Sequence, residues 1–242
     1  MLILLPPSET KRPGGVGISI DKAAIIWAAL DQVRDQVIAG LESLCQDSET
    51  ATKALNLGKQ TSAEITKNLS LMTSPTMPAL FRYSGVLYKA IDPDSLAESA
   101  IERAGQVLFI QSALFGLLPA LEQIPDYRFS ASSKIPGLNL EQLWIEGHKA
   151  VWPRMIGQIL DLRSVEYQEI NPIPTEKESF VVEVLTEDGK SMNHFNKQAK
   201  GLFVRAALEQ SLSDISQLPE VAATAGLRAE IEGRTVKLFA PK

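Results

Sequence analysis

Apolar positions along the chain follow two periods, one typical of helices and one typical of strands. From Ile26 to Leu44 they recur every three or four residues, which predicts an amphipathic helix that Asp21 can cap. Unbroken apolar runs at residues 1–5 and 107–111 predict short buried strands. Three prolines and three glycines follow within residues 6–17 and predict an irregular loop there.

The rest of the chain alternates between helical and strand patterns without a long linker. Residues 127–129 are expected as an edge strand, and the turn at 187–189 predicts a hairpin between strands at 180–185 and 191–195. A second hairpin is expected at 229–239. Further helices are predicted over residues 49–57, 62–71, 95–104, 140–160 with a break at Pro153, and 196–210.

These elements predict one domain over residues 1–242, of class α+β (mixed α/β), with a mixed sheet surrounded by helices. Residues 47–71 would form a small lobe of two helices. Gly58 lies at their break and can adopt the left-handed conformation that ends a helix.

The composition narrows the possible chemistry. A single cysteine, Cys45, excludes an intramolecular disulfide, and two histidines do not predict a Cys/His zinc site. Cys45 closes the apolar stripe that begins at Ile26 and is expected to pack rather than to react. No apolar run approaches the roughly 20 residues that cross a bilayer. We therefore expect a cytoplasmic protein with no membrane association, no metal and no other cofactor.

The charge is unevenly distributed. The net charge of −5 argues against a nucleic-acid binder when the chain is taken as a whole. Four windows nevertheless hold basic residues with at most one acid, at residues 10–20, 50–91, 127–140 and 190–205. Folding decides whether these windows meet, so a basic face and scattered surface charge both stay open.

The helix predicted at 196–210 carries Lys197, Lys200 and Arg205 within one arc. This arc is either an anion-binding face or an ordinary solvated face. Gly201 lies in the middle of the same helix, where glycine costs about 1 kcal/mol relative to alanine. A close approach by another helix or by a ligand would explain it.

Other polar residues are weaker candidates. The loop at 6–17 carries Ser8, Lys11 and Arg12, and its hydroxyls and backbone amides could hold a phosphate, although it does not match GxxxxGK[ST]. Ser112 ends a buried strand, where α/β folds place ligand sites, but no GxSxG elbow surrounds it. His194 has no paired cysteine or carboxylate at a recognisable spacing, so a structural role and a site role both stay open.

Six segments of the chain form a recognisable set: MLILLPPSETK (1–11), TMPALFRYSGVLYKAID (76–92), SALFGLLPALEQIPDYRF (112–129), LEQLW (140–144), DLRSVEY (161–167) and NHFNKQAKGLFVR (193–205). Together they resemble the YaaA family of bacterial peroxide stress proteins, and the resemblance covers nearly the whole chain. The PPSETK opening looks like that of the branch common in actinobacteria and relatives, whereas other members of the family read closer to SPAKT. The chain departs from the family pattern at three places. It has SALFG where the family has S-x-LYG, AKG where the family has ARG, and Ala120-Leu121-Glu122 where many members carry an aspartate.

The resemblance implies protection against hydrogen peroxide, associated with lower intracellular free iron. It also implies binding of duplex and branched DNA without strong sequence preference, through a positively charged cleft and a helix-hairpin-helix element. That element would fall at Leu57, Gly58 and Lys59, and no particular enzymatic activity is implied. The cleft would be lined by Ser8, Lys11, Arg12, Tyr88, Ser112, Arg128, Arg163, His194, Lys197, Lys200 and Arg205.

Two functions of different class follow from these observations. The first is a DNA-binding accessory of oxidative-damage repair, in which lysines and arginines neutralise phosphates. The alternative is an enzyme acting on a small phosphorylated or nucleotide-like ligand in the same cleft. An open groove as wide as a duplex favours the first, and a closed pocket of a few hundred Å³ favours the second. Direct iron handling has the least support, because no recognisable group of carboxylates and histidines is present.

Overall fold

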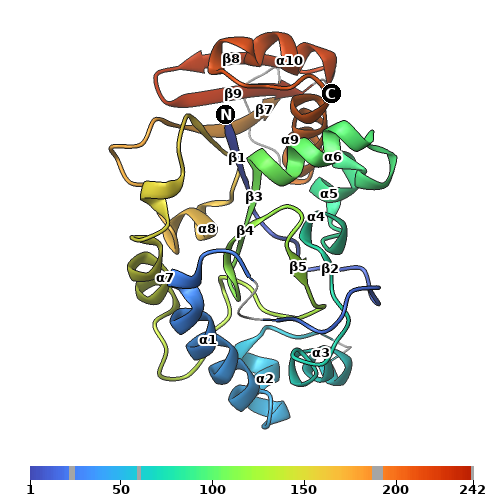
Figure 1. The fold of residues 1–242 in the computed structure, drawn as a ribbon, viewed down its shortest axis with the longest axis vertical. Coiled ribbons are helices and arrows are strands. Elements are labelled where there is room, and N and C mark those ends of the chain that lie inside the picture. Colours follow the sequence, from blue (N-terminus) through green and yellow to red (C-terminus); the bar gives the residue numbers. More distant parts are fainter. Residues whose placement is uncertain (22–24, 59–60, 187–192, 241–242) are drawn as a thin grey trace.

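The apolar run at the N-terminus folds as β1 (Leu2–Leu5) and lies inside a mixed sheet. The computed structural model describes the chain except residues 22–24, 59–60, 187–192 and 241–242 (Figure 1). Seven strands of the described chain pair in the order β4-β3-β1-β6-β7-β9-β8, and β4 and β8 are antiparallel to their neighbours at the two edges. The other strands are β2 (Met77–Pro78), β3 (Leu108–Ser112), β4 (Gly116–Pro119), β5 (Gln123–Ile124), β6 (Ile159–Asp161), β7 (Ser179–Thr186), β8 (Arg228–Glu232) and β9 (Thr235–Ala240).

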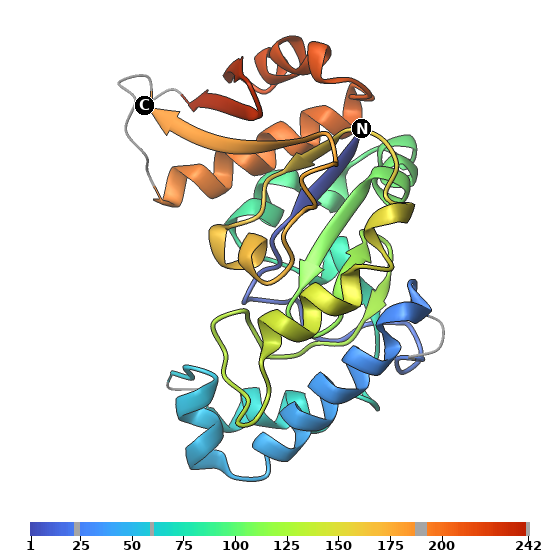
Figure 2. The same ribbon diagram turned by 90° about the vertical axis from the view of Figure 1, so that its left-hand side faces the viewer.

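Helices surround this sheet, which confirms the predicted α+β architecture. In both views the helices α1 to α3 lie at one end of the molecule, and α10 lies at the other end with β8 and β9 (Figures 1 and 2). The α-helices are α1 (Asp31–Leu44), α2 (Ser48–Ala54), α3 (Thr61–Leu69), α4 (Ala79–Arg82), α5 (Val86–Ile91), α6 (Glu98–Val107), α7 (Leu140–His148), α8 (Val165–Glu169), α9 (Asn193–Glu209) and α10 (Leu218–Thr224). Short 3-10 turns are η2 (Ala28–Leu30), η3 (Pro93–Ser95), η4 (Trp152–Arg154) and η5 (Ile215–Gln217).

The order of the parallel strands reverses direction at β1. Counted along the chain, the five parallel strands have the spatial order 2-1-3-4-5, because β3 is added on one side of β1 and β6, β7 and β9 are added on the other. Leu5 of β1 pairs with Ile110, and Leu4 pairs with Asp161. A reversal of this kind opens a crevice at the carboxyl ends of the strands, between the loops that leave them in opposite directions.

Two local predictions were wrong, each for an identifiable reason. Helix α1 begins at Asp31, because Trp27 has a left-handed backbone with φ 67° and only the turn η2 precedes the helix. Residues 127–129 form no strand. The side chain of Asn68 instead bonds both backbone groups of Arg128, at 2.8 and 2.9 Å, and replaces a partner strand.

The expected hairpin after β7 was also wrong where the structure describes it. Residues 193–195 begin α9 instead of forming a second strand, and the turn at 187–189 lies outside the described residues. Strand β7 pairs with β6 and β9 in parallel. Of the helix predicted over residues 140–160, only α7 up to His148 forms. The break at Pro153 was confirmed, since the separate turn η4 contains it, but the helical part predicted after it was wrong, because Ile159 and Leu160 belong to β6.

Gly201 lies where α9 packs closely against α5. A Cβ atom at this position would lie 2.3 Å from the carbonyl oxygen of Leu87 and 2.6 Å from Cβ of Ala90. The close approach expected from the sequence is therefore made by another helix. It places Lys197, one turn earlier in α9, beside the beginning of α5.

The pair of short helices, α2 and α3, confirms the two segments predicted at 49–57 and 62–71. Leu57 and Gly58 lie in their connection, and Lys59 lies outside the described residues. Nearby, Cys45 is buried and accepts a hydrogen bond from Asn68 at 3.5 Å. Burial raises the pKa of its thiol, so Cys45 packs and is not poised as a thiolate, as expected.

Candidate functional site

A pocket of about 390 Å³ lies at the carboxyl ends of β1 and β6, where the strand order reverses. We call it the switch-point pocket. The loop after β1, the beginning of α5 and the segment that opens α8 form its walls, and one lysine of α9 completes it. Its lining residues are Pro6, Pro7, Ser8, Glu9, Thr10, Gly85, Val86, Leu87, Tyr88, Ser130, Ser132, Ser164, Glu166, Tyr167 and Lys197.

Hydroxyl groups dominate the polar lining of this pocket. Ser8 and Thr10 share a hydrogen bond of 3.1 Å, and Ser130 and Ser132 share one of 3.0 Å. Three further polar side chains in the pocket make no hydrogen bond or ion pair within the part of the chain that the structure describes; they are Ser164, Glu166 and Lys197. The pocket thus offers neutral donors and acceptors together with one free carboxylate and one free ammonium group.

All four tyrosines of the chain gather at this pocket. Tyr88 and Tyr167 line it, and the ring of Tyr83 lies 5.2 Å from that of Tyr88. The hydroxyl of Tyr83 shares a hydrogen bond of 2.7 Å with that of Tyr127. Burial raises the pKa of all four phenols, so each remains protonated and hydrogen-bonds as a neutral group, and Tyr88 and Tyr167 form part of the pocket wall.

Ser112 ends β3 as predicted, but its hydroxyl is fully used inside the protein. It accepts hydrogen bonds from the backbone N–H groups of Leu114 and Phe115, both at 3.1 Å, and shares a third of 2.8 Å with Tyr127. Ser112 is buried and is absent from the lining of the switch-point pocket. Its geometry is that of a residue holding the turn after β3.

Arg163 does not line the pocket but holds one of its walls in place. Its guanidinium forms a two-pronged ion pair with Asp161 at 2.8 and 2.9 Å, and both side chains are buried. It also donates to the carbonyl oxygens of Tyr167 at 3.3 Å and Asn171 at 2.8 Å. These bonds attach α8, which carries Glu166 and Tyr167, to the end of β6, so Arg163 is a positioning residue for one wall.

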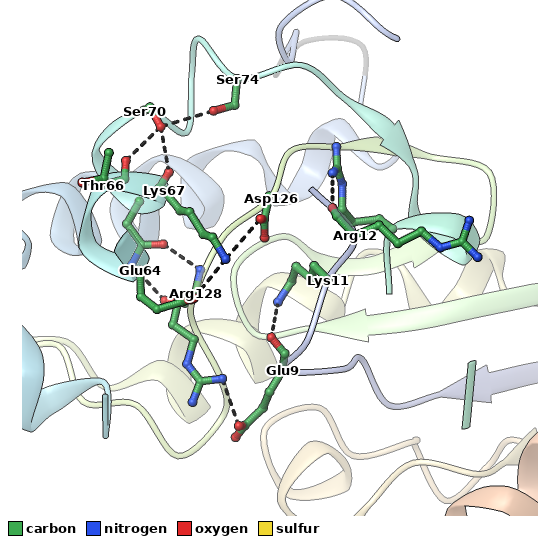
Figure 3. Close-up of polar contacts among 12 residues, drawn as sticks. Glu9, Lys11, Arg12, Glu64, Thr66, Lys67, Ser70, Ser74, Asp126 and Arg128 are labelled. Atoms are coloured by element: carbon green, nitrogen blue, oxygen red, sulfur yellow. Dashed lines mark hydrogen bonds and ion pairs between the residues drawn. The ribbon is translucent and has the colours of Figure 1, made fainter. Parts of the chain in front are cut away.

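Lys11 and Arg128 lie beside the pocket, where the loop after β1 meets the segment before residue 130 (Figure 3). Arg128 pairs with Glu9 at 2.9 Å. The Lys11 amine donates to the main-chain oxygens of Ser8 and Glu9, at 3.1 and 3.4 Å. Arg12 points elsewhere and pairs with Asp94. The structure thus brings Ser8, Lys11 and Arg128 together.

The three cations expected on one face of α9 have different surroundings. Lys197 is exposed and lines the pocket. The amine of Lys200 is buried, donates to the carbonyl oxygen of Leu162 at 3.0 Å, and has its pKa lowered to about 8 by burial. Arg205 donates to Ile91 and Ser95 and pairs with Glu209. His194 lies in α9, and its side chain lies outside what the structure describes.

A second, more open groove of about 970 Å³ adjoins the pocket. It runs between α2 and residues 129–141, and it shares Ser132 and Glu166 with the switch-point pocket. Its charged lining is mixed, with two lysines, Lys53 and Lys134, and three glutamates, Glu141, Glu166 and Glu169.

The described residues contain no group of three or more His, Cys, Asp and Glu side chains placed to hold a metal ion. A search of the same residues finds no helix with the length and apolar character that crossing a membrane requires.

Several pocket residues had no place among the sequence-based candidates. Gly85, Ser164 and Glu166 were missed, although Ser164 follows directly on β6 and its short loop. The available signal was positional, because a polar residue just after a buried parallel strand belongs to the ligand-binding edge of the sheet.

Comparison with known proteins assigns the family. Residues 1–231 match the family model described as peroxide stress protein YaaA. The chain is 38% identical to a UPF0246 protein of Corynebacterium glutamicum over 95% of both chains, and 35% identical to one of Streptomyces coelicolor over 96% of this chain and 92% of the relative. An uncharacterized protein of Campylobacter jejuni is 25% identical over 90% of this chain and 89% of its own length. With the family model spanning nearly its whole length, this chain belongs to the YaaA (UPF0246) family of peroxide stress proteins.

Proposed function

We propose that the switch-point pocket binds a small phosphorylated or nucleotide-like ligand, and that this binding underlies the part the protein plays in peroxide stress. The observation that carries the proposal is the position of a hydroxyl-rich pocket of about 390 Å³ at the point where the strand order reverses. A volume of a few hundred Å³ suits a small molecule and is too small for a duplex. The reducing cytoplasm is the compartment proposed for this activity.

The free polar groups suggest how such a ligand would be held. Lys197, exposed and unpaired within the described chain, would meet a phosphate group, and the serine and threonine hydroxyls would bond the sugar or further phosphate oxygens. Glu166 faces the same pocket from the first turn of α8. A carboxylate and an ammonium group in the same pocket would suit acid–base chemistry on the bound molecule.

Replacing Lys197 with alanine is expected to weaken binding of a nucleoside monophosphate about tenfold or more, because a charge-assisted hydrogen bond is lost. Binding of the matching nucleoside, which lacks phosphate, should change little. Calorimetric titration of both ligands measures this difference. Lys89→Ala is the matched control, since Lys89 is an exposed lysine of neighbouring α5 outside the pocket lining. Equal loss for both ligands, or none, would contradict the assignment of Lys197 to phosphate.

We propose DNA as a second ligand, held in the open groove beside α2. This proposal rests on the YaaA family resemblance and on the groove of about 970 Å³ with exposed Lys53 and Lys134 in its lining, next to the helix pair α2 and α3. Phosphate neutralisation would make binding sequence-tolerant. By the same resemblance, protection of DNA by this protein would occur together with lower intracellular free iron. Iron binding by this chain is no part of the proposal, because the described residues offer no grouped ligands.

The double substitution Lys53→Gln with Lys134→Gln is expected to weaken duplex binding about equally for unrelated sequences. It should also lower the slope of log affinity against log salt by up to about two units, if both lysines contact phosphate. Fluorescence anisotropy at several salt concentrations gives both quantities. The control pair, Lys149→Gln with Lys237→Gln, removes the same charge from residues outside the groove. Unchanged affinity and slope in the first pair would remove this groove from DNA binding.

A further inference from the structure

Gly201 of α9 contacts the backbone of a helix that forms one wall of the switch-point pocket. A Cβ atom at position 201 would lie 2.3 Å from the carbonyl oxygen of Leu87, whereas real Cβ atoms essentially never approach another heavy atom within 3.0 Å. Leu87 lines the pocket and Gly201 does not. Gly201 can therefore influence the pocket only through the position of α5.

This contact separates Gly201 from the other glycines that lie inside described helices. A Cβ atom at Gly40, Gly105 or Gly147 would have side-chain atoms as its nearest neighbours, and the end of a flexible side chain can turn aside. The carbonyl oxygen of Leu87 is part of the main chain and cannot. A side chain at position 201 therefore requires α5 and α9 to move apart.

The loop after β1 holds α5 from the side opposite to α9. The hydroxyl of Tyr88 donates to the carbonyl oxygen of Pro6 in that loop, at 2.8 Å. Ala90 faces α9, since its Cβ atom would lie 2.6 Å from a Cβ atom at Gly201. Two residues along a helix correspond to a turn of about 200°, so Tyr88 and Ala90 point in nearly opposite directions. Helix α5 therefore lies between α9 and the loop after β1, in contact with both.

This arrangement places the ammonium group and two hydroxyl groups of the pocket on separate bodies. Lys197 belongs to α9, one turn before Gly201, whereas Ser8 and Thr10 belong to the loop that is bonded to α5. To lengthen the contact with Leu87 from 2.3 to 3.0 Å, an added methyl group must move α5 away from α9 by at least about 0.7 Å. Hydrogen-bond lengths vary over only about 0.5 Å, so a ligand held from both sides would lose one of its contacts.

We propose that Gly201 is a positioning residue that sets the distance between Lys197 and the hydroxyl groups of Ser8 and Thr10, and that it thereby selects ligands that bridge them. This inference rests on the proposed function, because it takes the ligand of the pocket to be a small phosphorylated compound. It narrows that class to compounds in which a phosphate group and a hydroxyl-bearing group lie at a fixed separation, such as a nucleoside monophosphate. Inorganic phosphate meets Lys197 alone, so its binding does not depend on this distance.

The experiment is calorimetric titration of Gly201→Ala and of the unchanged protein with a nucleoside monophosphate and with inorganic phosphate. We expect the substitution to weaken binding of the nucleotide about tenfold or more, and binding of inorganic phosphate less than about twofold. Gly105→Ala is the matched control, because it makes the same change inside α6, where the added methyl group meets only the end of the Leu121 side chain. An equal loss for both probes, or no loss for the nucleotide, would overturn the selection by Gly201.

The spacing can also be measured without a ligand. In crystal structures of the two proteins, the Cα atoms of Lys197 and Ser8 should lie about 0.7 Å or more farther apart in Gly201→Ala. Ala90→Val adds methyl groups at the same contact from the side of α5, and it serves for both measurements if Gly201→Ala does not fold. An unchanged separation would overturn the role of Gly201 whether or not the pocket binds a ligand. Failure of the unchanged protein to bind either probe would instead contradict the proposed function, and with it the ligand class inferred here.

Discussion

Replacing Arg163 with methionine is expected to lower the free energy of unfolding by about 3–5 kcal/mol, because it leaves Asp161 charged and unpaired in a buried site. The substitution also removes the donors to the carbonyl oxygens of Tyr167 and Asn171, which attach α8 to the sheet. Urea unfolding measures the loss. Hydrogen exchange should accelerate most in α8, the wall of the switch-point pocket that Arg163 holds.

Two further variants separate this effect from a general loss of charge. Arg12→Met breaks the ion pair between Arg12 and Asp94, whose side chains are 40% and 54% exposed respectively. Because this pair is solvated, the substitution should lower the free energy of unfolding by less than about 1 kcal/mol. Combining Asp161→Leu with Arg163→Met should recover part of the lost stability, because no charge then remains buried without a partner. If Arg163→Met costs no more than Arg12→Met, the buried pair does not have the structural role assigned to it.

Acidification from pH 7 to pH 5 is expected to cost about 2 kcal/mol of unfolding free energy through His148 alone. The imidazole is buried, its Nδ1–H donates to the carbonyl oxygen of Trp144 at 2.7 Å, and its Nε2 accepts from the N–H of Leu117 at 3.2 Å. A second ring proton would face the N–H of Leu117. A protonated imidazole would also be a charge in a buried place, so burial lowers the pKa of His148 from 6.5 to about 4.

The direction follows from which state binds the proton. Below pH 6.5 the unfolded chain protonates this histidine and the folded chain does not until about pH 4, so stability falls as the pH falls through this window. Urea unfolding of the protein and of a His148→Gln variant between pH 4.5 and 7.5 isolates the contribution, since all other groups are common to both. Parallel pH dependence in the two proteins would show that His148 is not held neutral by the fold.

The sequence predicts those elements that local pattern determines. β1 and β3 are unbroken apolar runs, and the break at Pro153 follows from the missing N–H of proline. The structure of residues 127–129 could not be predicted in this way, because the partner of that segment is the side-chain amide of Asn68, sixty positions away. Strand β4 was missed because its four residues pair with β3 across a tight turn at the sheet edge.

The residues of the candidate site likewise fall into those that the sequence could predict and those that depend on distant pairing. Ser8, Tyr88 and Lys197 were named from the sequence and do line the switch-point pocket. Ser164 and Glu166 were not, because their place at the pocket depends on β6 lying next to β1, a pairing that joins residues 157 positions apart. Helical periodicity put Lys200 and Arg205 on one arc of α9, but it gave no information on the Leu162 oxygen that binds Lys200 or on Glu209 as a partner of Arg205.

The central place of β1 in the sheet has a consequence for folding during synthesis on the ribosome. Its four residues are made before both of its neighbours, which begin only at Leu108 and Ile159. At a synthesis rate of about 5–20 residues per second, the apolar segment Leu2–Leu5 waits roughly 8–30 s for its second neighbour. Both edges of β1 are open until β3 has emerged, and one edge stays open to pairing with other nascent chains until β6 has emerged. Pairing of Leu2–Leu5 with both of its native neighbours therefore comes late in synthesis, and its unpaired edge is a site for aggregation until then.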